Sequence, residues 1–249
     1  MKEAILTGKN LEKKYLDNKV IDNIDIEIYQ NDFTIIMGSS GAGKSTLLYL
    51  LSGMDKPSSG NVFYNGSDIN RLSEKQMANL RHDKFGFVFQ QANLVSNLTV
   101  FENIAVAGYA NRNNKAKDVE EKTAQLLDYM HITNIKNRFP SQISGGESQR
   151  AAVARAVINT PDIIFADEPT GALNKTNTEE VMDILTNINH TGQSILMVTH
   201  DLYSAVRGNR ILYMEDGKIT DELLLSSYNK DSAKEREKQI STWLADMHW

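Results

Sequence analysis

The sequence predicts an α/β fold with a mainly parallel sheet, an N-terminal antiparallel β subdomain and an inserted α-helical subdomain. In the first third, apolar and polar residues alternate with a period of two, as in half-buried antiparallel strands. Residues 99–159 instead read as helices with few strand signals between them. From residue 162 onward, short apolar runs alternate with helical stretches, which indicates a parallel sheet with right-handed crossovers.

The N-terminal third is expected to hold strands and tight turns. The alternation is clearest from Ile24 to Ile28, and Asn65-Gly66 after NVFY is a hairpin turn signal. The run FTIIMG, residues 33–38, is instead continuously apolar up to its glycine, and TLLYLLSG follows the next loop. That pattern is typical of a buried parallel strand that feeds a helix.

The remaining elements follow in chain order. The apolar run FGFVFQ at 85–90 is a strand that precedes the helical subdomain, whose helices are expected at 99–111, 117–131 and 145–159. Further strands are expected at DIIFAD (162–167), SILMVT (194–199) and RILYME (210–215), with helices at 176–190 and 201–207.

The tail from Ser232 to Trp249 is charged and predicted to be helical. Its apolar residues recur at helical spacing and are Ile240, Trp243, Leu244 and Met247. We expect a helix that docks against the domain, with a partner-binding element as the alternative. We interpret residues 1–249 as one domain with a helical subdomain at about 91–160 and a C-terminal helix at about 232–247.

Composition excludes several classes of protein. The net charge of −5 lacks the electrostatic footprint of a nucleic-acid-binding protein, so we expect no nucleic-acid partner. The absence of cysteine excludes disulfides, thiolate metal sites and cysteine nucleophiles. No apolar stretch approaches the roughly 18 residues of a membrane span, and MKEAILTGKNLEKKY lacks the apolar core of a signal peptide. If this protein works at a membrane, we therefore expect something else to anchor it there.

The segment GSSGAGKST, residues 38–46, fits the phosphate-loop pattern of two glycines flanking four residues, followed by Lys and Ser. Because it lies between an apolar strand and a helix, its backbone N–H groups and the helix N-terminus can converge on phosphate oxygens. Lys44 would reach the β and γ phosphates, and the Ser45 hydroxyl would ligate Mg²⁺. The alternative is an ordinary glycine turn. The predicted nucleotide contacts are Gly38, Ser39, Ser40, Gly41, Ala42, Gly43, Lys44, Ser45 and Thr46.

Two acidic residues end the apolar run IIFADEP, residues 163–169. Asp167 at the end of the strand can bind in the magnesium shell, and Glu168 can orient or deprotonate an attacking water. Adjacent carboxylates on an apolar strand are costly to bury unpaired, so packing alone explains them poorly. The alternative is a solvated acidic turn.

Five motifs now stand in order along the chain: GSSGAGKST, the glutamine of FVFQ, ISGGESQR, FADEPT and the histidine of VTHD. Their order and spacing resemble those of ATP-binding-cassette ATPases, which have a P-loop NTPase core, and the likeness covers nearly the whole chain. The residues around these motifs, including LTVFENIA, ADEPTGALN and WLADMHW, look most like the bacterial subgroup of peptide-antibiotic resistance and macrolide or lipoprotein exporters. Within that subgroup, the tail looks most like the bacitracin or lantibiotic resistance type.

The resemblance implies a composite active site. In this family the helix start at ISGGE contacts the γ-phosphate held by the opposite subunit, so two copies of the chain would enclose ATP and Mg²⁺. The implied contacts from this tip are Ser144, Gly145, Gly146 and Glu147. Glu147 stands where the family usually has glutamine, yet Ser144-x-x-Glu147 also reads as a capping box, in which either residue works. We favour a tolerated substitution over an impaired site.

Other positions are carried over one at a time. The resemblance implies that Tyr15 stacks on adenine, that Gln90 contacts magnesium or the attacking water, and that His200 contacts the γ-phosphate. A core tyrosine, a surface glutamine and a polar cap are the respective alternatives. Asn174 replaces an aspartate common in the family, which puts communication between the two sites in doubt, and Arg138 is either near the transporter contact or simply solvated.

The function implied is that of the ATP-hydrolysing subunit of a bacterial transporter, peripheral to the cytoplasmic face of the membrane. It would energise a separate integral membrane permease and form an ATP-sandwich homodimer. Antimicrobial-peptide resistance is the preferred role, with lipoprotein release or macrolide efflux as alternatives. Two alternatives come from other functional classes. One is an ATPase of the same family that is not involved in transport, and the other is a nucleotide sensor that closes without turnover.

Overall fold

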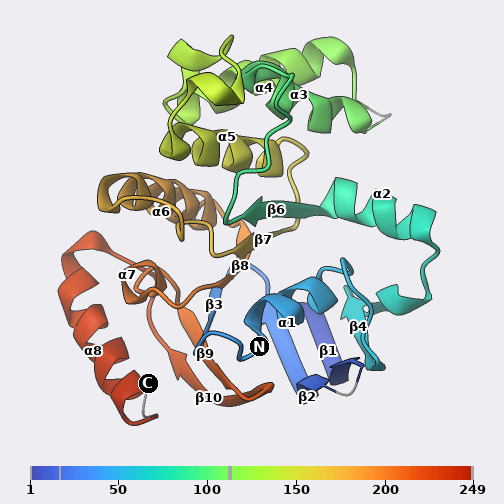
Figure 1. Cartoon of the computed structure of the whole chain (residues 1–249), viewed down its shortest axis with the longest axis vertical. Coiled ribbons are helices and arrows are strands. Elements are labelled where there is room, and N and C mark those ends of the chain that lie inside the picture. The colour runs from blue at the N-terminus through green and yellow to red at the C-terminus, as the bar shows by residue number, and fades with distance from the viewer. Residues whose placement is uncertain (1, 17, 112–113, 248–249) are drawn as a thin grey trace. The chain divides into compact units, whose positions relative to one another are not determined.

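The computed structural model describes residues 2–16, 18–111 and 114–247, and the chain divides into two compact units. One unit is formed by Met1–Met77 with Thr186–Trp249, and the other by Ala78–Leu185. The chain enters the second unit within helix α2 (Glu74–Lys84) and returns to the first within helix α6 (Lys175–His190), both labelled in Figure 1.

The first unit contains both ends of the chain. Its strands are β1 Ala4–Tyr15, β2 Asn18–Tyr29, β3 Phe33–Met37, β4 Ser59–Tyr64, β5 Ser67–Asp68, β8 Ser194–Val198, β9 Arg210–Glu215 and β10 Lys218–Leu224. Its helices are α1 Lys44–Leu51, α7 Leu202–Ala205 and α8 Ala233–Ala245, with 3₁₀ turns at Ile69–Arg71 and Lys230–Ser232.

The N-terminal sheet is antiparallel, with the strand order β2-β1-β4-β5. In β2 the isoleucines at 24, 26 and 28 are buried while Asp25 and Glu27 are exposed, which confirms the predicted alternation. The hairpin turn after β4 is also confirmed: Asn65 and Gly66 have φ angles of 45° and 75°, and both signs match the two-residue turn that such a hairpin needs.

Strands further along the chain pair in parallel. Strand β3 pairs in parallel with β8 on one side and β9 on the other, and all five of its residues are buried. Strand β10, which was not predicted, turns back antiparallel to β9 through Asp216-Gly217, both with positive φ. That Asp-Gly pair is a hairpin signal that could have revealed the strand.

The second unit combines a parallel strand pair with helices. Its elements are β6 Phe85–Phe89, α3 Val100–Ala110, α4 Ala116–Tyr129, α5 Gly145–Val157 and β7 Ile163–Asp167, with 3₁₀ turns at Thr133–Ile135 and Pro140–Gln142. Strands β6 and β7 are parallel, and Phe165 packs against the rings of Phe85 and Phe87 at centroid distances of 5.2 and 5.5 Å. The predicted α/β class, with an antiparallel N-terminal sheet and inserted helices, is therefore confirmed.

The helices differ from expectation at two places. Helix α2 was not predicted, because it is polar and Met77 is its single buried residue. The signal for it was a helix-start pattern, in which Gln76 accepts from the backbone N–H of Ser73. The helix expected at 201–207 is shorter, spanning Leu202–Ala205 after an N-cap by Asp201.

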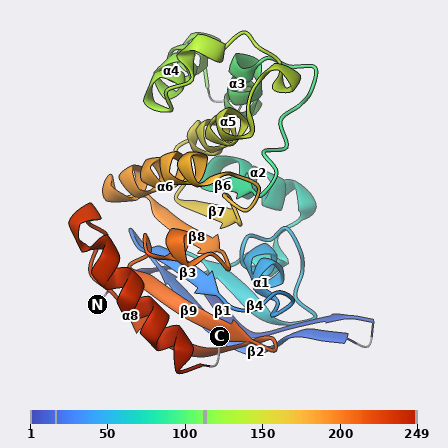
Figure 2. The ribbon, with the colours of Figure 1, turned by 60° about the vertical axis from the view of Figure 1, so that its left-hand side comes forward.

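Helix α8 docks within the first unit, as Figure 2 shows beside β9. Ile240 and Leu244 are buried, and the Trp243 ring meets Tyr213 edge-on at 6.3 Å. The buried Arg236 guanidinium donates to the backbone carbonyls of Val206, Gly208 and Ser226. The tail therefore serves as a docking helix, as expected, while its last two residues lie outside the described part of the chain.

Candidate functional site

The loop between β3 and α1 is shaped for an anion. Gly41 and Gly43 have φ angles of 85° and 99°, which favour glycine, and a β-carbon on Gly38 would lie 2.0 Å from the Met214 carbonyl oxygen. Helix α1 begins after Gly43 without any side-chain cap and without an acidic residue in its first turn. The positive end of the helix dipole therefore lies at this loop, with no acidic side chain in the first turn to offset it.

Lys44 curls back over this loop. Its ammonium group donates to the carbonyls of Gly38 and Ser39, each at 2.8 Å, and the residue is buried. A buried lysine charge needs such acceptors, because isolated it would be strongly disfavoured. The loop thus holds a positive charge beside the N-terminus of α1, although the chain as a whole is acidic.

His200 lies at the same edge of the sheet as the start of this loop. Strands β3 and β8 are parallel with Ile36 opposite Val198, so Gly38 and His200 each follow two residues beyond a register pair. The backbone N–H of Thr199 donates to the Ile36 carbonyl at 3.1 Å, which extends the pairing toward the histidine. The side chain of His200 is exposed.

Tyr15, at the end of β1, is 48% exposed and is therefore not the core tyrosine of the alternative interpretation. Its hydroxyl donates to Asp55 at 2.6 Å. This hydrogen bond is the main reason why the pKa of Tyr15 rises to about 12, with burial and the Asp55 charge adding to it and a hydrogen bond with Thr46 opposing it. Asp55 was missed by the sequence analysis, since nothing in its local sequence marks it.

In the second unit, the ends of β6 and β7 bring three predicted residues together. Phe89 and Asp167 are register partners, so Gln90 and Glu168 each follow directly at the carboxyl edge of the strand pair. A β-carbon on Gly171 would lie 2.8 Å from Nε2 of Gln90, and the N–H of Gly171 donates to the Glu168 carbonyl. The Gln90 side chain therefore packs on the turn that carries Glu168.

Glu168 itself has an unusual backbone. Its φ of 45° is in the left-handed region, which a residue with a β-carbon rarely adopts. Strained conformations of this kind occur most often at functional sites, where the surrounding structure enforces them.

The tip of α5 is closed by a complete capping box, as the structural interpretation of Glu147 predicted. Ser144 Oγ accepts from the N–H of Glu147 at 3.3 Å, and one carboxylate oxygen accepts from the Ser144 N–H at 2.7 Å and from its hydroxyl at 2.8 Å. The hydrogen bond from the Ser144 backbone is the main cause that lowers the pKa of Glu147, and the charges of Arg150 and Arg138 add to it.

Asn174 and Arg138 have local partners in this unit. The Asn174 side-chain oxygen accepts from the N–H of Asn177 at 3.0 Å, so Asn174 caps the start of α6. Arg138 is exposed, and its backbone carbonyl accepts from Val100 at the start of α3. Arg138 also lies near enough to Glu147 to lower the pKa of that residue.

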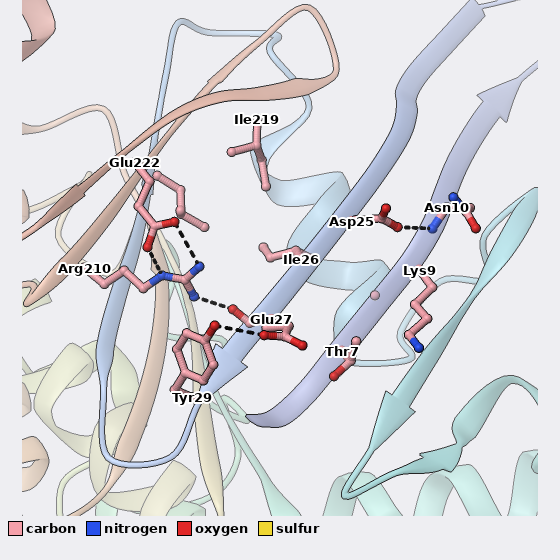
Figure 3. A pocket seen from close by; sticks show the side chains of 12 residues that line it. Thr7, Lys9, Asn10, Asp25, Ile26, Glu27, Tyr29, Arg210, Ile219 and Glu222 are labelled. Carbon is pink, nitrogen blue, oxygen red and sulfur yellow. Dashed lines mark hydrogen bonds and ion pairs between the residues drawn. The ribbon is translucent and has the colours of Figure 1, made fainter. Parts of the chain in front are cut away.

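A separate hollow in the first unit, with a volume of about 430 Å³, lies among β1, β2, β9 and β10 (Figure 3). The buried Arg210 side chain spans it, donating to Glu222 and to the backbone carbonyl of Glu27. Tyr29 donates to the Glu27 carboxylate at 2.8 Å beneath the same guanidinium. Because these charged groups are paired with one another, we interpret the arrangement as structural. We call Arg210, Glu222, Glu27 and Tyr29 the clamp.

Among the described residues, no group of three or more His, Cys, Asp or Glu side chains is arranged to hold a metal ion. Hydroxyl and carboxylate oxygens are ligands that suit Mg²⁺, which protein sites commonly bind through one or two side chains together with substrate phosphates. Within residues 2–16, 18–111 and 114–247, the helices are too short or too polar to cross a bilayer.

Comparison with known proteins gives a consistent result. The family model "ABC transporter" matches residues 21–171. The chain is 41% identical to the lipoprotein-releasing system ATP-binding protein LolD of Aquifex aeolicus over 219 residues, covering 88% of this chain and 97% of LolD. It is also 41% identical to the bacitracin export ATP-binding protein BceA of Halalkalibacterium halodurans over 225 residues, covering 88% of each.

Two further relatives extend the comparison. The macrolide export ATP-binding/permease protein MacB of Pasteurella multocida is 36% identical over 247 residues, but this chain, 97% of which is aligned, spans only 38% of MacB. The ATP-binding cassette MJ0796, solved as a dimer in a post-hydrolysis state with ADP and phosphate, has a TM-score of 0.83 and 35% identity, covering 90% of this chain and all of the solved one.

Proposed function

Because this chain belongs to the ABC transporter family as an ATP-binding and ATP-hydrolysing subunit, we propose that two copies enclose two Mg·ATP and thereby drive a separate membrane permease. The permease anchors the pair at the cytoplasmic face of the membrane. ATP binding closes the pair, and hydrolysis with product release reopens it. Coupling of this kind converts the binding energy of the nucleotide into movement of the permease.

The loop at residues 38–46 holds the triphosphate in this proposal. Lys44 exchanges its loop carbonyls for β- and γ-phosphate oxygens, which is a charge-assisted contact. The N–H groups at the start of α1 bind the same phosphates. The observation that carries the proposal is the glycine loop before α1, with the buried Lys44 side chain folded across it and bonded to its carbonyls.

The carboxyl edge of β6 and β7 handles the attacking water. Glu168 accepts the proton from the water or orients it, and Gln90, packed on the same turn, contacts the water or the magnesium shell. Ser45 and Asp167 would hold Mg²⁺, which supplies charge neutralisation on the β and γ phosphates. Holding the reactants in position with charge stabilisation accounts for most of the catalysis.

The γ-phosphate has two further contacts in the proposal. His200 reaches it from the end of β8, and the tip of α5 reaches it from the opposite copy. At that tip Ser144, Gly145 and Gly146 present the positive end of a helix to the anion. Neither copy has a complete site by itself, so turnover requires the pair.

The permease contact is proposed on the second unit. Several large apolar side chains on α3 and in the segments that precede it and bond to its start are exposed, which suits a protein partner better than water. They are Val95, Val106, Tyr109 and Phe139. The N–H groups of Val100 and Phe101 donate to carbonyls of residues 138 and 136, which ties the start of α3 to the segment that carries Phe139.

The preferred transported substrate is an antimicrobial peptide of the bacitracin class, with resistance as the physiological result. The similarity to BceA over 88% of each chain supports this choice. The equal identity to LolD makes lipoprotein release the main alternative, and the similarity to MacB makes macrolide efflux another. ATPase activity of the complex with its permease, measured with each substrate class in turn, separates them. Stimulation by lipoprotein or macrolide alone contradicts the peptide assignment.

The catalytic part of the proposal is tested with Glu168→Gln. ATP should still bind and a long-lived dimer should accumulate, while hydrolysis falls at least about a hundredfold, since the proton acceptor is lost. Gel filtration with ATP and single-turnover phosphate release measure both. Glu179→Gln, a matched change on α6, is the control and should hydrolyse ATP at the normal rate. Normal turnover in Glu168→Gln would remove this residue from the mechanism.

A further inference from the structure

Lys13, Tyr15 and Asp55 form a compact cluster at the C-terminal end of β1. Asp55 accepts from the Tyr15 hydroxyl at 2.6 Å and from the Lys13 ammonium at 2.7 Å, one on each carboxylate oxygen. The Lys13 ammonium also donates to the carbonyl of Lys56 and lies 4.8 Å from the centre of the Tyr15 ring. The tyrosine is thus tied both at its hydroxyl and against one face.

The ring that these ties hold is exposed. Tyr15 is 48% exposed, whereas the Lys13 side chain is only 11% exposed, so the lysine covers one ring face and leaves ring surface open to solvent. An exposed tyrosine ordinarily samples several rotamers, and fixing it costs conformational entropy. Two charged side chains and a cation–π contact nevertheless fix this ring, although it is exposed and not part of the hydrophobic core.

The exposed face of the Tyr15 ring lies close to the phosphate loop. The hydroxyl of Tyr15 is also hydrogen-bonded with Thr46, the last residue of the phosphate loop, which places the ring next to the bound nucleotide of the proposed function. Leu16, directly after the ring, has a φ of 52°, so the chain turns away sharply at this point. The ring therefore lies at the edge of the phosphate site.

We propose that Lys13 and Asp55 are positioning residues that hold the Tyr15 ring flat as the stacking surface for the nucleobase of ATP. This inference rests on the proposed function, in which Tyr15 contacts adenine. Asp55 fixes the direction of the ring through the hydroxyl, and Lys13 supports the face opposite the base. A fixed ring loses less entropy when the base stacks, so the pair raises affinity for the nucleoside part alone.

The same unit contains a matched control. Tyr29 donates to Glu27 at 2.8 Å, and the Arg210 guanidinium lies 4.8 Å from its ring centre. Figure 3 shows these three side chains together. This second trio has the same chemistry but belongs to the clamp in the hollow among β1, β2, β9 and β10. Tyr29→Phe removes the equivalent hydrogen bond and should leave nucleotide affinity unchanged.

The test compares binding of ATP with binding of inorganic tripolyphosphate by calorimetry on the full chain. Asp55→Asn should weaken ATP binding about threefold, the scale of one net hydrogen bond, without changing tripolyphosphate binding. Tyr15→Ala should weaken ATP binding about fivefold or more, the scale of one stacked base. In the Tyr15→Ala background, Asp55→Asn should have no further effect. Tyr15→Phe, which keeps the ring and removes only the tie, should resemble Asp55→Asn.

The contrary outcomes are distinct. If Asp55→Asn weakens tripolyphosphate equally, or still acts without the Tyr15 ring, Asp55 supports the phosphate loop and the inference is wrong. If Tyr15→Ala weakens ATP binding but Asp55→Asn does not, the positioning role alone is wrong. If Tyr15→Ala leaves ATP binding unchanged, the adenine contact in the proposed function fails and this inference fails with it.

Discussion

Gly146 and Asn177 approach each other so closely that a β-carbon at position 146 would lie 2.4 Å from Cγ of Asn177. Gly145, one residue earlier, differs: a β-carbon there would meet its nearest neighbour, Leu173, at an ordinary 3.6 Å. The glycines at the first two positions of α5 therefore need different explanations. Packing against α6 demands the second, while nothing within the described chain demands the first.

The Gly146 contact predicts a loss of stability. Gly146→Ala should lower the free energy of unfolding by about 1–3 kcal/mol, because the added carbon overpacks the contact with Asn177. Chemical denaturation measures the loss. Asn177→Ala removes the colliding amide, so the double variant Gly146→Ala/Asn177→Ala should be more stable than the sum of the single changes implies. Strict additivity would show that the two residues do not compete for space.

Gly145→Ala is expected to act on turnover without harming the fold. Alanine has a higher helix propensity than glycine, so the unfolding free energy should stay equal or rise by up to about 1 kcal/mol. ATP hydrolysis should nevertheless fall about tenfold or more, since the methyl group would stand between the helix end and the partner's phosphate. Steady-state phosphate release and a thermal melt on one preparation check both. Full activity would argue against the composite site.

Lys44→Ala should weaken nucleotide binding itself. The ammonium makes charge-assisted hydrogen bonds, each worth about 1.5–3 kcal/mol, so affinity for ATP should fall about 10- to 150-fold. Fluorescent nucleotide titration measures the change. Lys14→Ala, which removes an exposed lysine of β1, is the control and should bind normally. Tight ATP binding by Lys44→Ala would contradict the phosphate-loop assignment.

Glu147→Gln should change turnover by less than about tenfold, because glutamine can complete the same capping box. Its effect on stability should depend on pH. The pKa of Glu147 is lowered in the folded chain, so the carboxylate contributes stability above its unfolded pKa, near 4.5, and loses it as pH falls through the folded value.

Thermal melts of the wild-type and Glu147→Gln chains should therefore differ most at neutral pH and converge in acid. Glu121→Gln, on the exposed face of α4, serves as the control for a general acid effect. A rise in ATPase activity beyond about tenfold in Glu147→Gln would instead mark the natural glutamate as an impairment of the site.

The cap made by Asn174 predicts a graded series. Asn174→Ala should lower the unfolding free energy by about 1 kcal/mol, since the N–H of Asn177 loses its acceptor. Asn174→Asp keeps the cap and should match the wild type in stability. Comparing the two by denaturant titration tests the cap. The Hill coefficient for ATP in Asn174→Asp then reports whether a charge at this turn alters communication between the two sites.

Features that depend on neighbours in the chain could be predicted from the sequence. The capping box of Ser144 and Glu147, the Asn65-Gly66 turn and the glycine loop before Lys44 each involve contacts within a few residues, so their residue types and spacing were sufficient. Helix α2 and strand β10 also carried local signals, at Ser73 and at Asp216-Gly217, but weak hydrophobic patterning concealed them.

Residue types and their spacing were enough to identify the segments of the phosphate loop, the acidic strand end and the capped helix tip, because local backbone geometry follows from local residue types. The hydrogen bond from Tyr15 to Asp55, across a separation of 40 residues, and the close approach of Asn177 to Gly146 became known only from the folded chain. Such contacts have no spacing rule, since they depend on how whole strands and helices pack once apolar surface is buried.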